Sequence, residues 1–261
     1  MTDPRDVPTI AYHVQRADGS SLLSRDADTV FYAASTVKLA VLAAVARAVD
    51  DGSLNLDDTV ASRRTFTSDV AGAPDFEIDP DDRDEGMPPE GTPMAIAEVI
   101  ERMIVVSSNE ATNIASDLVG LGAVARVLAD AGATASSYGC KYSDFAASGA
   151  GATRNTTPRD LARLMSAIVS GALASPRSTE WMTALLARQQ DRLLTATFAD
   201  DTPFGSKSGS VTRIRHDVAY RGAPGPTATV IAVCTGGYDS QAAADEAMRA
   251  IGQVVAATLG A

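Results

Sequence analysis

Histidine and cysteine are scarce in this sequence of 261 residues, which contains two of each. His13 and His216 are too few for a multi-histidine zinc site, and they leave little basis for a Ser-His-Asp triad. Cys140 and Cys234 are too few for a disulfide framework, so we expect two free thiols. Neither a Gly-x-Ser-x-Gly turn nor a glycine-rich phosphate loop occurs. We therefore expect a protein that holds no metal and no other cofactor.

Basic residues are in the minority, because 22 Lys and Arg face 33 Asp and Glu and the formal net charge is -11. Such a surface repels polyanions, so we expect neither nucleic acid nor a membrane as a partner. Residues 1–8 have no basic segment and no apolar run, so we expect no signal peptide, and no apolar stretch is long enough to span a bilayer. The sequence as it stands predicts a cytoplasmic monomer, or an extracytoplasmic one if a leader was removed.

The spacing of apolar residues predicts strands, then helices, then strands and a final helix. Strands are expected at residues 9–16, 21–25, 204–208, 218–221 and 228–235. Helices are expected at residues 35–49, 94–104, 110–119, 124–131, 158–170, 176–188 and 241–259. This order predicts an α+β fold of two lobes within a single domain, residues 1–261. An antiparallel sheet lobe with the terminal helix would span about 8–34 and 200–261, and an inserted all-helical lobe about 35–199, with the functional cleft between them.

One segment has a biased composition, residues 75–91, which are rich in Asp, Glu and Pro. The spacing of Asp79, Asp81 and Asp84 suggests calcium, but the full ligand pattern of a calcium loop is missing. We expect a solvated surface loop.

The most informative pattern is Ser35-Thr36-Val37-Lys38, which opens a strongly apolar segment. On a helix, a spacing of three residues places the hydroxyl and the amine on the same face. A serine hydroxyl is too weak an acid to attack an amide unaided, and an amine that is kept partly neutral can take its proton. Ser35 is therefore the candidate nucleophile and Lys38 its base, although a serine N-cap followed by a surface lysine is a common alternative.

Two further motifs follow along the chain, and their order is informative. Residues 107–109 (S-S-N) precede a predicted helix, and residues 207–209 (K-S-G) end a predicted strand. Ser-x-x-Lys, Ser-Asp-Asn and Lys-Thr-Gly are typical of class A β-lactamases and penicillin-binding proteins. With F-Y-A-A-S-T-V-K, S-S-N-E-A-T-N and N-T-T-P also present, the chain resembles this penicillin-recognising serine hydrolase family over most of its length. The resemblance implies a β-lactamase-like fold.

The resemblance also implies catalytic roles for four residues. Ser35 would be acylated with the help of Lys38. Ser107 would pass a proton to the leaving nitrogen, and Lys207 would complete the catalytic set while it holds the substrate carboxylate.

A set of substrate-binding residues follows from the same resemblance: Asn109, Ser208, Gly209, Ser210 and Arg215. Asn109 would bind the side-chain amide of the substrate, and Ser208 would share its carboxylate with Lys207. The N–H groups of the nucleophile and of Ser210 would form the oxyanion hole. Arg215 is a further candidate for the carboxylate, and the alternative for it is a surface charge on the strand connection.

Two departures from the family pattern stand out. Ser108 replaces the family's Asp, which we expect to alter the anchoring of the helix more than the chemistry. No Glu lies between Glu110 and Glu180, although class A enzymes place one there to activate the deacylating water. Counting back from the N-T-T-P turn puts Lys141 near that place, with Asp144 close by as a possible substitute.

These residues predict a serine hydrolase that forms an acyl-enzyme at Ser35 and opens the amide of a β-lactam, with slow deacylation because the usual Glu is missing. Two alternatives stay open. One is a DD-peptidase or esterase that acts on a peptide or ester substrate, and the other is a penicillin-binding protein that is acylated without turnover. In each case the partner is a small molecule.

Overall fold

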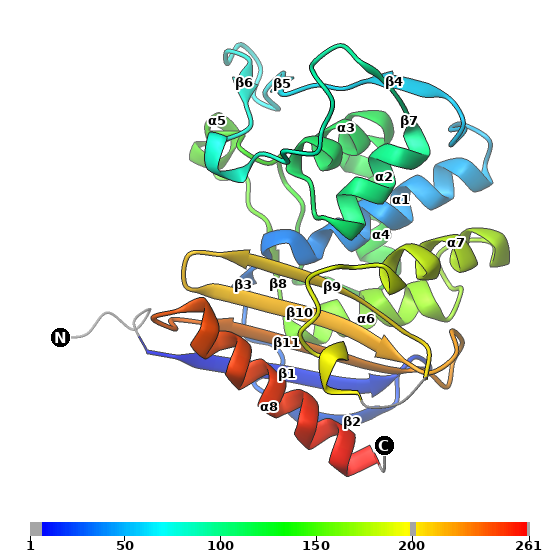
Figure 1. Ribbon diagram of the computed structural model, residues 1–261, viewed down its shortest axis with the longest axis vertical. Coiled ribbons are helices and arrows are strands. Elements are labelled where there is room, and N and C mark those ends of the chain that lie inside the picture. Colours follow the sequence, from blue (N-terminus) through cyan, green and yellow to red (C-terminus); the bar gives the residue numbers. More distant parts are fainter. Residues whose placement is uncertain (1–6, 199–201, 260–261) are drawn as a thin grey trace.

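The computed structural model describes residues 7–198 and 202–259 and is organised around one antiparallel sheet (Figure 1). Its strands are β1 (Thr9–Arg16), β2 (Ser21–Arg25), β9 (Phe204–Val211), β10 (Ile214–Arg221) and β11 (Thr229–Gly236). Their order is β2-β1-β11-β10-β9, so strands from the two ends of the chain pair in the middle of the sheet. The antiparallel sheet and the α+β class are as the sequence predicted. The first six residues and the predicted lobe boundary at 199–200 lie outside the described residues.

Helices cover both faces of this sheet. Successive side chains of a strand point to opposite faces, and on β11 Ala232 packs into one hydrophobic core while Ile231 packs into another. Helix α6 (Pro158–Val169) packs against β1, β10 and β11 on the first face. Helix α8 (Gln241–Leu259) crosses the other face, in front of the sheet in Figure 1. Because both faces are covered, the three late strands are buried along most of their length, and this includes charged residues such as Lys207 and Asp217.

Helix α1 (Lys38–Asp50) is the centre of the helical part of the molecule. Residues 38–46 are all buried, as expected for a helix that is apolar on every side. Its neighbours are α2 (Ile96–Val105), α3 (Asn109–Val119), α4 (Leu121–Asp130) and α7 (Pro176–Ala187). Within the described ranges no single helix is long and apolar enough to cross a membrane, and α3 with α4 reaches that length only as a pair bent by 89°.

Short elements connect these parts. They are β3 (Phe31–Tyr32), β4 (Thr59–Ala61), β5 (Thr65–Phe66), β6 (Phe76–Glu77), β7 (Pro93–Ala95), β8 (Asn155–Thr156), α5 (Phe145–Gly149) and the 3-10 turns η2 (Ala34–Val37), η3 (Pro80–Asp82) and η4 (Thr195–Thr197). β3 pairs with β8, and η2 packs against β9 and β10. The start of α1 therefore meets the edge strand of the sheet.

The structure corrects several predicted boundaries. The helix predicted to begin at Ser35 begins at Lys38, because the first turn is a 3-10 helix. Strands β9 and β10 are both longer than predicted, since their pairing extends to a tight turn at Thr212 and Arg213. The short helix α5 was not expected. Cys140 and Cys234 are buried free thiols, as predicted.

The acidic segment 75–91 differs most from its prediction as a solvated loop. Ile78 and Met87 are buried in the main core. The Asp84 carboxylate accepts two hydrogen bonds from Arg102, at 2.6 and 2.8 Å, and the backbone N–H of Asp84 faces the buried carboxylate of Glu110 at 3.2 Å. This segment is thus anchored to α2 and α3. Its two buried apolar residues explain why it packs against the helices, although its overall composition is charged.

Candidate active site

The nucleophile candidate lies on a strained turn where the helical part meets the sheet. Ser35 is half-buried in η2, directly after Ala34, whose φ of 48° is uncommon for a non-glycine residue. The Thr36 hydroxyl donates to the Ala33 carbonyl at 2.6 Å and closes this turn. Strain of this kind persists only where the surroundings hold it, and it is concentrated at functional sites.

Lys38, three residues after Ser35, holds its amine in a site closed to solvent. The side chain is fully buried, and Nζ contacts the Ser107 carbonyl at 2.6 Å, the Ser107 Oγ at 3.3 Å and the Asn109 Oδ1 at 2.8 Å. Burial, followed by the nearby charges of Lys207 and Arg154, holds the pKa of Lys38 well below its usual value. The shift is toward the neutral amine, the form that a general base requires.

Ser107 lies between two buried amines. Its Oγ is 3.3 Å from Nζ of Lys38 and accepts a hydrogen bond from Nζ of Lys207 at 3.0 Å. Burial lowers the pKa of Lys207 to about 7, although Asp217 and Asp191 oppose the shift. Ser107 also has a positive φ of 63°, so its backbone is strained like that of the nucleophile turn. The hydroxyl can therefore exchange protons with either amine.

Strand β9 approaches the nucleophile more closely than a side chain would permit. A Cβ on Gly209 would lie 2.7 Å from the Ser35 nitrogen and 2.9 Å from the Thr36 nitrogen. Only glycine fits there, so residue 209 brings the backbone of the third motif against that of the first. A pocket of about 310 Å³ opens at this contact. It is lined by Ser35, Val105, Val106, Ser107, Gln189, Gln190, Asp191, Ser208, Gly209 and Ser210.

The second motif forms the N-terminal end of α3. Ser108 is the N-cap, and its Oγ accepts from the Ala111 N–H at 3.2 Å. This contact agrees with the prediction that the change from Asp to Ser concerns helix anchoring. The Asn109 side chain points its oxygen at Lys38 and donates its nitrogen to the Asp82 carbonyl at 3.5 Å.

Gln189, which sequence reasoning missed, joins the end of α2 to the third motif. With its amide nitrogen facing the carbonyl oxygens of Ile104 and Val105, its oxygen accepts from Ser208 Oγ at 3.0 Å and from Lys207 Nζ at 3.3 Å. A glutamine after a helix carries no signal of such a role in the sequence.

The side chain of Arg215 forms its hydrogen bonds with residues outside the three motifs. It lies opposite Ser210 on β10, but its guanidinium forms two hydrogen bonds to Asp191, at 2.7 and 2.8 Å, and one to Asp245 at 2.7 Å. The side chain is only 4% exposed. These ion pairs tie β10 to α8 and to the segment after α7, so its predicted role with the substrate carboxylate is not supported by its contacts.

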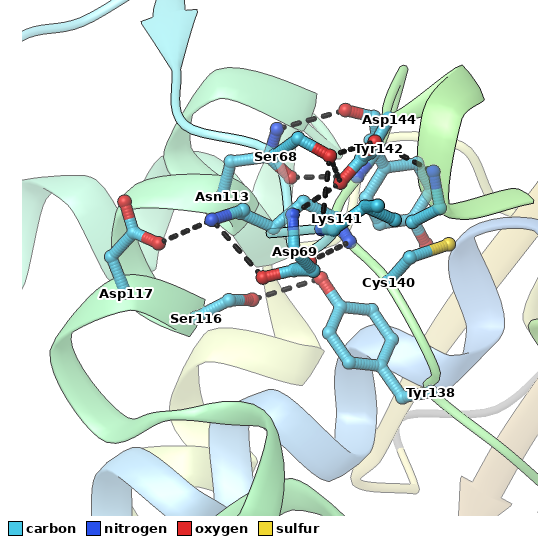
Figure 2. A network of polar contacts seen from close by, with 12 residues as sticks. Ser68, Asp69, Asn113, Ser116, Asp117, Tyr138, Cys140, Lys141, Tyr142 and Asp144 are labelled. Atoms are coloured by element: carbon cyan, nitrogen blue, oxygen red, sulfur yellow. Dashed lines mark hydrogen bonds and ion pairs between the residues drawn. The ribbon is translucent and has the colours of Figure 1, made fainter. Parts of the chain in front are cut away.

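The two residues predicted to activate water are engaged elsewhere (Figure 2). The Lys141 amine lies between Asp117 at 3.0 Å and Asp69 at 3.3 Å. The Asp144 carboxylate is the N-cap of α5, and it also accepts from the Asp69 N–H and the Ser68 hydroxyl. Both side chains anchor the loop 138–144 to neighbouring segments, so their contacts do not support the predicted chemical role.

Tyr142, between these two residues, is the part of the loop that reaches the site. Its hydroxyl donates to the Ala34 carbonyl at 2.8 Å, and its ring centroid is 4.6 Å from Nζ of Lys38. Burial raises the pKa of Tyr142 well above 10, against the opposing charge of Arg154. Tyr142 lies one position after Lys141, the residue that the count back from the N-T-T-P turn reached.

In the part of the chain that the structure describes, no group of three or more His, Cys, Asp or Glu side chains is arranged to hold a metal ion. His216 is buried, and burial lowers its pKa to about 4. Its Nε2 faces the Tyr32 carbonyl at 2.9 Å, so it supports the strand before the nucleophile.

Comparison with known proteins identifies the family. The family model described as "Beta-lactamase enzyme family" matches residues 5–259, almost the entire chain. The chain belongs to the β-lactamase enzyme family. This membership and the fold confirm the resemblance to class A β-lactamases and penicillin-binding proteins, and they support a serine β-lactamase-like hydrolase.

Solved structures of similar proteins share this fold. A β-lactamase from Sphaerobacter thermophilus DSM 20745 is 27% identical with a TM-score of 0.81, over 98% of this chain and 94% of that one. PBP-A is 25% identical with a TM-score of 0.79, over 99% of this chain and 92% of that one. A mutant of PBP-A, solved as an acyl-enzyme complex with penicillin G, is 25% identical with a TM-score of 0.78, over 99% and 92%. The curated protein sequences include no significant match.

Proposed function

We propose that the chain is a serine hydrolase that opens the amide of a β-lactam through an acyl-enzyme at Ser35. The observation that carries this proposal is the meeting of three motifs around one hydroxyl, since Ser107 Oγ contacts the amines of both Lys38 and Lys207. Burial of the amines of Lys38 and Lys207 is unfavourable, because an amine loses its hydration. A purely structural role for these lysines would give nothing that offsets this cost.

Acylation can then proceed with every proton accounted for. Ser35 Oγ bonds to the carbonyl carbon while its proton passes to the neutral amine of Lys38. The oxygen of that carbonyl gains negative charge, which the N–H groups of Ser35 and Ser210 would stabilise. The C–N bond then breaks, the nitrogen takes the proton of Ser107, and Ser107 regains one from Lys38.

Substrate recognition in this proposal depends on the edge strand. The charged amine of Lys207 and the hydroxyl of Ser208 would bind the carboxylate of the substrate through charge-assisted hydrogen bonds. The Asn109 side chain would bind its amide once the substrate enters. Arg215 would act mainly through Asp191, which lines the same pocket.

The second half of the reaction distinguishes the alternatives. Deacylation needs an activated water, and Lys141 and Asp144 are both engaged in contacts that anchor their loop. We infer a slow hydrolase that accumulates adduct. The likeness to PBP-A, of which a mutant was solved as an acyl-enzyme with penicillin G, keeps a DD-peptidase or a penicillin-binding protein without turnover as the second candidate.

The test is the intact mass of the protein after mixing with penicillin G. The parent should gain the mass of one penicillin on the peptide that contains Ser35, since ring opening releases no leaving group. Ser35→Ala should gain none while it keeps its fold, and Lys38→Ala should be acylated far more slowly. Cys140→Ala, which removes a buried free thiol, is the matched control and should react like the parent. An adduct that persists in Ser35→Ala would refute the assignment of the nucleophile.

A further inference from the structure

A second cavity borders the catalytic pocket. It has a volume of about 450 Å³, which is within the range of small-molecule sites, and Ser210 lines both spaces. Residues 210–215, residues 238–241 and Ala244 line it from the sheet and α8, and η3 contributes Asp82. The proposed function puts the carbonyl of the substrate at the N–H of Ser210, so part of a bound substrate would lie beside this second cavity.

Asp82 is connected to the catalytic residues through Asn109. The Asn109 nitrogen donates to the Asp82 carbonyl at 3.5 Å, and its oxygen contacts the amine of Lys38 at 2.8 Å. Burial lowers the pKa of Lys38, and the charge of Asp82 is one of those that oppose the shift. The Asp82 carboxylate is therefore close enough for its charge to act on the catalytic amine.

The fold holds the backbone of Asp82 in this place. Asp79 caps η3 by accepting from the Asp81 N–H at 3.1 Å. Asp84, two residues after Asp82, accepts two hydrogen bonds from Arg102 at 2.6 and 2.8 Å. Asp82 itself is exposed. A carboxylate that is accessible on a fixed backbone is suited to contact a ligand.

The other charged residues of this cavity are paired within the protein. Arg215 is bonded by two carboxylates, and Arg213 forms an ion pair at 3.6 Å with Asp239, which also lines the cavity. Among the residues that the structure describes, no cation forms an ion pair with Asp82. The negative charge of Asp82 is thus available to a ligand, and it favours a group that is positively charged.

We propose that Asp82 is a specificity-determining residue that selects substrates with an ammonium group next to the amide that Asn109 binds. This inference rests on the proposed acylation of Ser35. Asn109 offers the Asp82 carbonyl the same nitrogen that would bind the amide of the substrate. A substituent on the carbon beside that amide is therefore the part of the acyl group that would approach Asp82. An ammonium group there would form an ion pair with the carboxylate, and a carboxylate there would be repelled.

Three penicillins that differ only at this carbon are the probes. Ampicillin carries an amine there, penicillin G a hydrogen and carbenicillin a carboxylate. The measurement is the second-order rate constant for adduct formation at Ser35, followed by intact mass at about pH 6.5, where an α-amino group is protonated. Ratios between substrates cancel any change in the reactivity of Ser35 and Lys38, because such a change affects all three substrates alike.

The charge of Asp82 should favour ampicillin. We expect Asp82→Asn to lower the rate ratio of ampicillin to penicillin G by about twofold to fivefold, the size of an exposed ion pair, and to raise that of carbenicillin to penicillin G. The substitution keeps the carbonyl that Asn109 contacts. Added salt should weaken the preference of the parent for ampicillin, because salt screens exposed charges.

Asp81→Asn is the matched control. It removes the charge of an exposed neighbour that does not line the cavity, so both rate ratios should stay close to those of the parent. An equal change of the ratios in Asp81→Asn and Asp82→Asn would refute the inference, because the charge of the whole segment would then be the cause.

The remaining outcomes separate this inference from the proposed function. A parent that forms no adduct at Ser35 with any of the three penicillins refutes the proposed function and this inference with it. If all three acylate Ser35 and the ratio of ampicillin to penicillin G does not fall in Asp82→Asn, the role of Asp82 is refuted and the proposed function stands. A ratio of carbenicillin to penicillin G that falls in Asp82→Asn would also refute that role, because it contradicts repulsion by the carboxylate.

Discussion

The pH dependence of acylation should reveal the charge of Lys207. Its pKa is lowered to about 7 by burial, so the amine loses its proton as the pH rises through neutrality. The neutral amine still donates a hydrogen bond, but without the charge that binds a carboxylate strongly. We therefore expect the second-order rate constant for acylation by penicillin G to fall above about pH 7.

The size of this fall can be worked from the charged fraction. With a pKa of about 7, about half of Lys207 is charged at pH ~7 and about 1% at pH ~9. A charge-assisted hydrogen bond contributes about 1.5 to 3 kcal/mol, a factor of about 12 to 150 in affinity. Weighted by these fractions, the rate constant should fall by about 6-fold to 30-fold between the two pH values.

Stopped-flow measurement at low substrate concentration is the suitable assay, because the second-order constant reports the pKa values of the free enzyme. Lys207→Arg is the comparison, since arginine stays charged over this range, and the ratio of parent to variant cancels the titration of Lys38. Profiles of parent and variant that run parallel from pH ~7 to pH ~9 would refute the reasoning.

Two further substitutions test the geometry of the site. Gly209→Ala should lower the acylation rate by about 10² to 10³, the value of an oxyanion-hole donor, because its methyl would lie 2.7 Å from the Ser35 nitrogen; Gly122→Ala, whose Cβ meets only the end of Arg126 at 3.7 Å, should react like the parent. Glu110→Gln should shift the acid limb of the acylation profile to lower pH, because the Glu110 charge raises the pKa of Lys38, and an unchanged limb would contradict this.

The sequence predicted the parts of the site that local spacing controls. Ser35 and Lys38 are three residues apart on one turn, so their proximity follows from helical geometry alone. The order of the elements, which was read from hydrophobic periodicity, predicted the antiparallel sheet. The meeting of Ser107 with Lys207 followed from the family resemblance, because no local rule links residues that are 100 positions apart.

Other features could not be read from the sequence, for physical reasons that differ. Arg215 pairs with Ser210, directly after the third motif, and Tyr142 lies one position after Lys141. At both places the burial and the partners of the side chain depend on tertiary packing. Asp144 looked like a spare acid, but a carboxylate before a short helix is also an N-cap, and only the structure decides between these uses. The positive φ of Ala34 had no signal, because alanine does not favour that conformation.

The net charge of the whole chain and the basic side chains buried next to the pocket have opposite signs, and distance decides which of them a substrate meets. The net charge of -11 acts at long range, where salt screens it beyond about 8 Å. Inside the site Lys207, while it is protonated, and Arg154 place positive charge near Lys38, and desolvation strengthens their fields. We therefore expect an anionic substrate to be attracted only after it reaches the pocket.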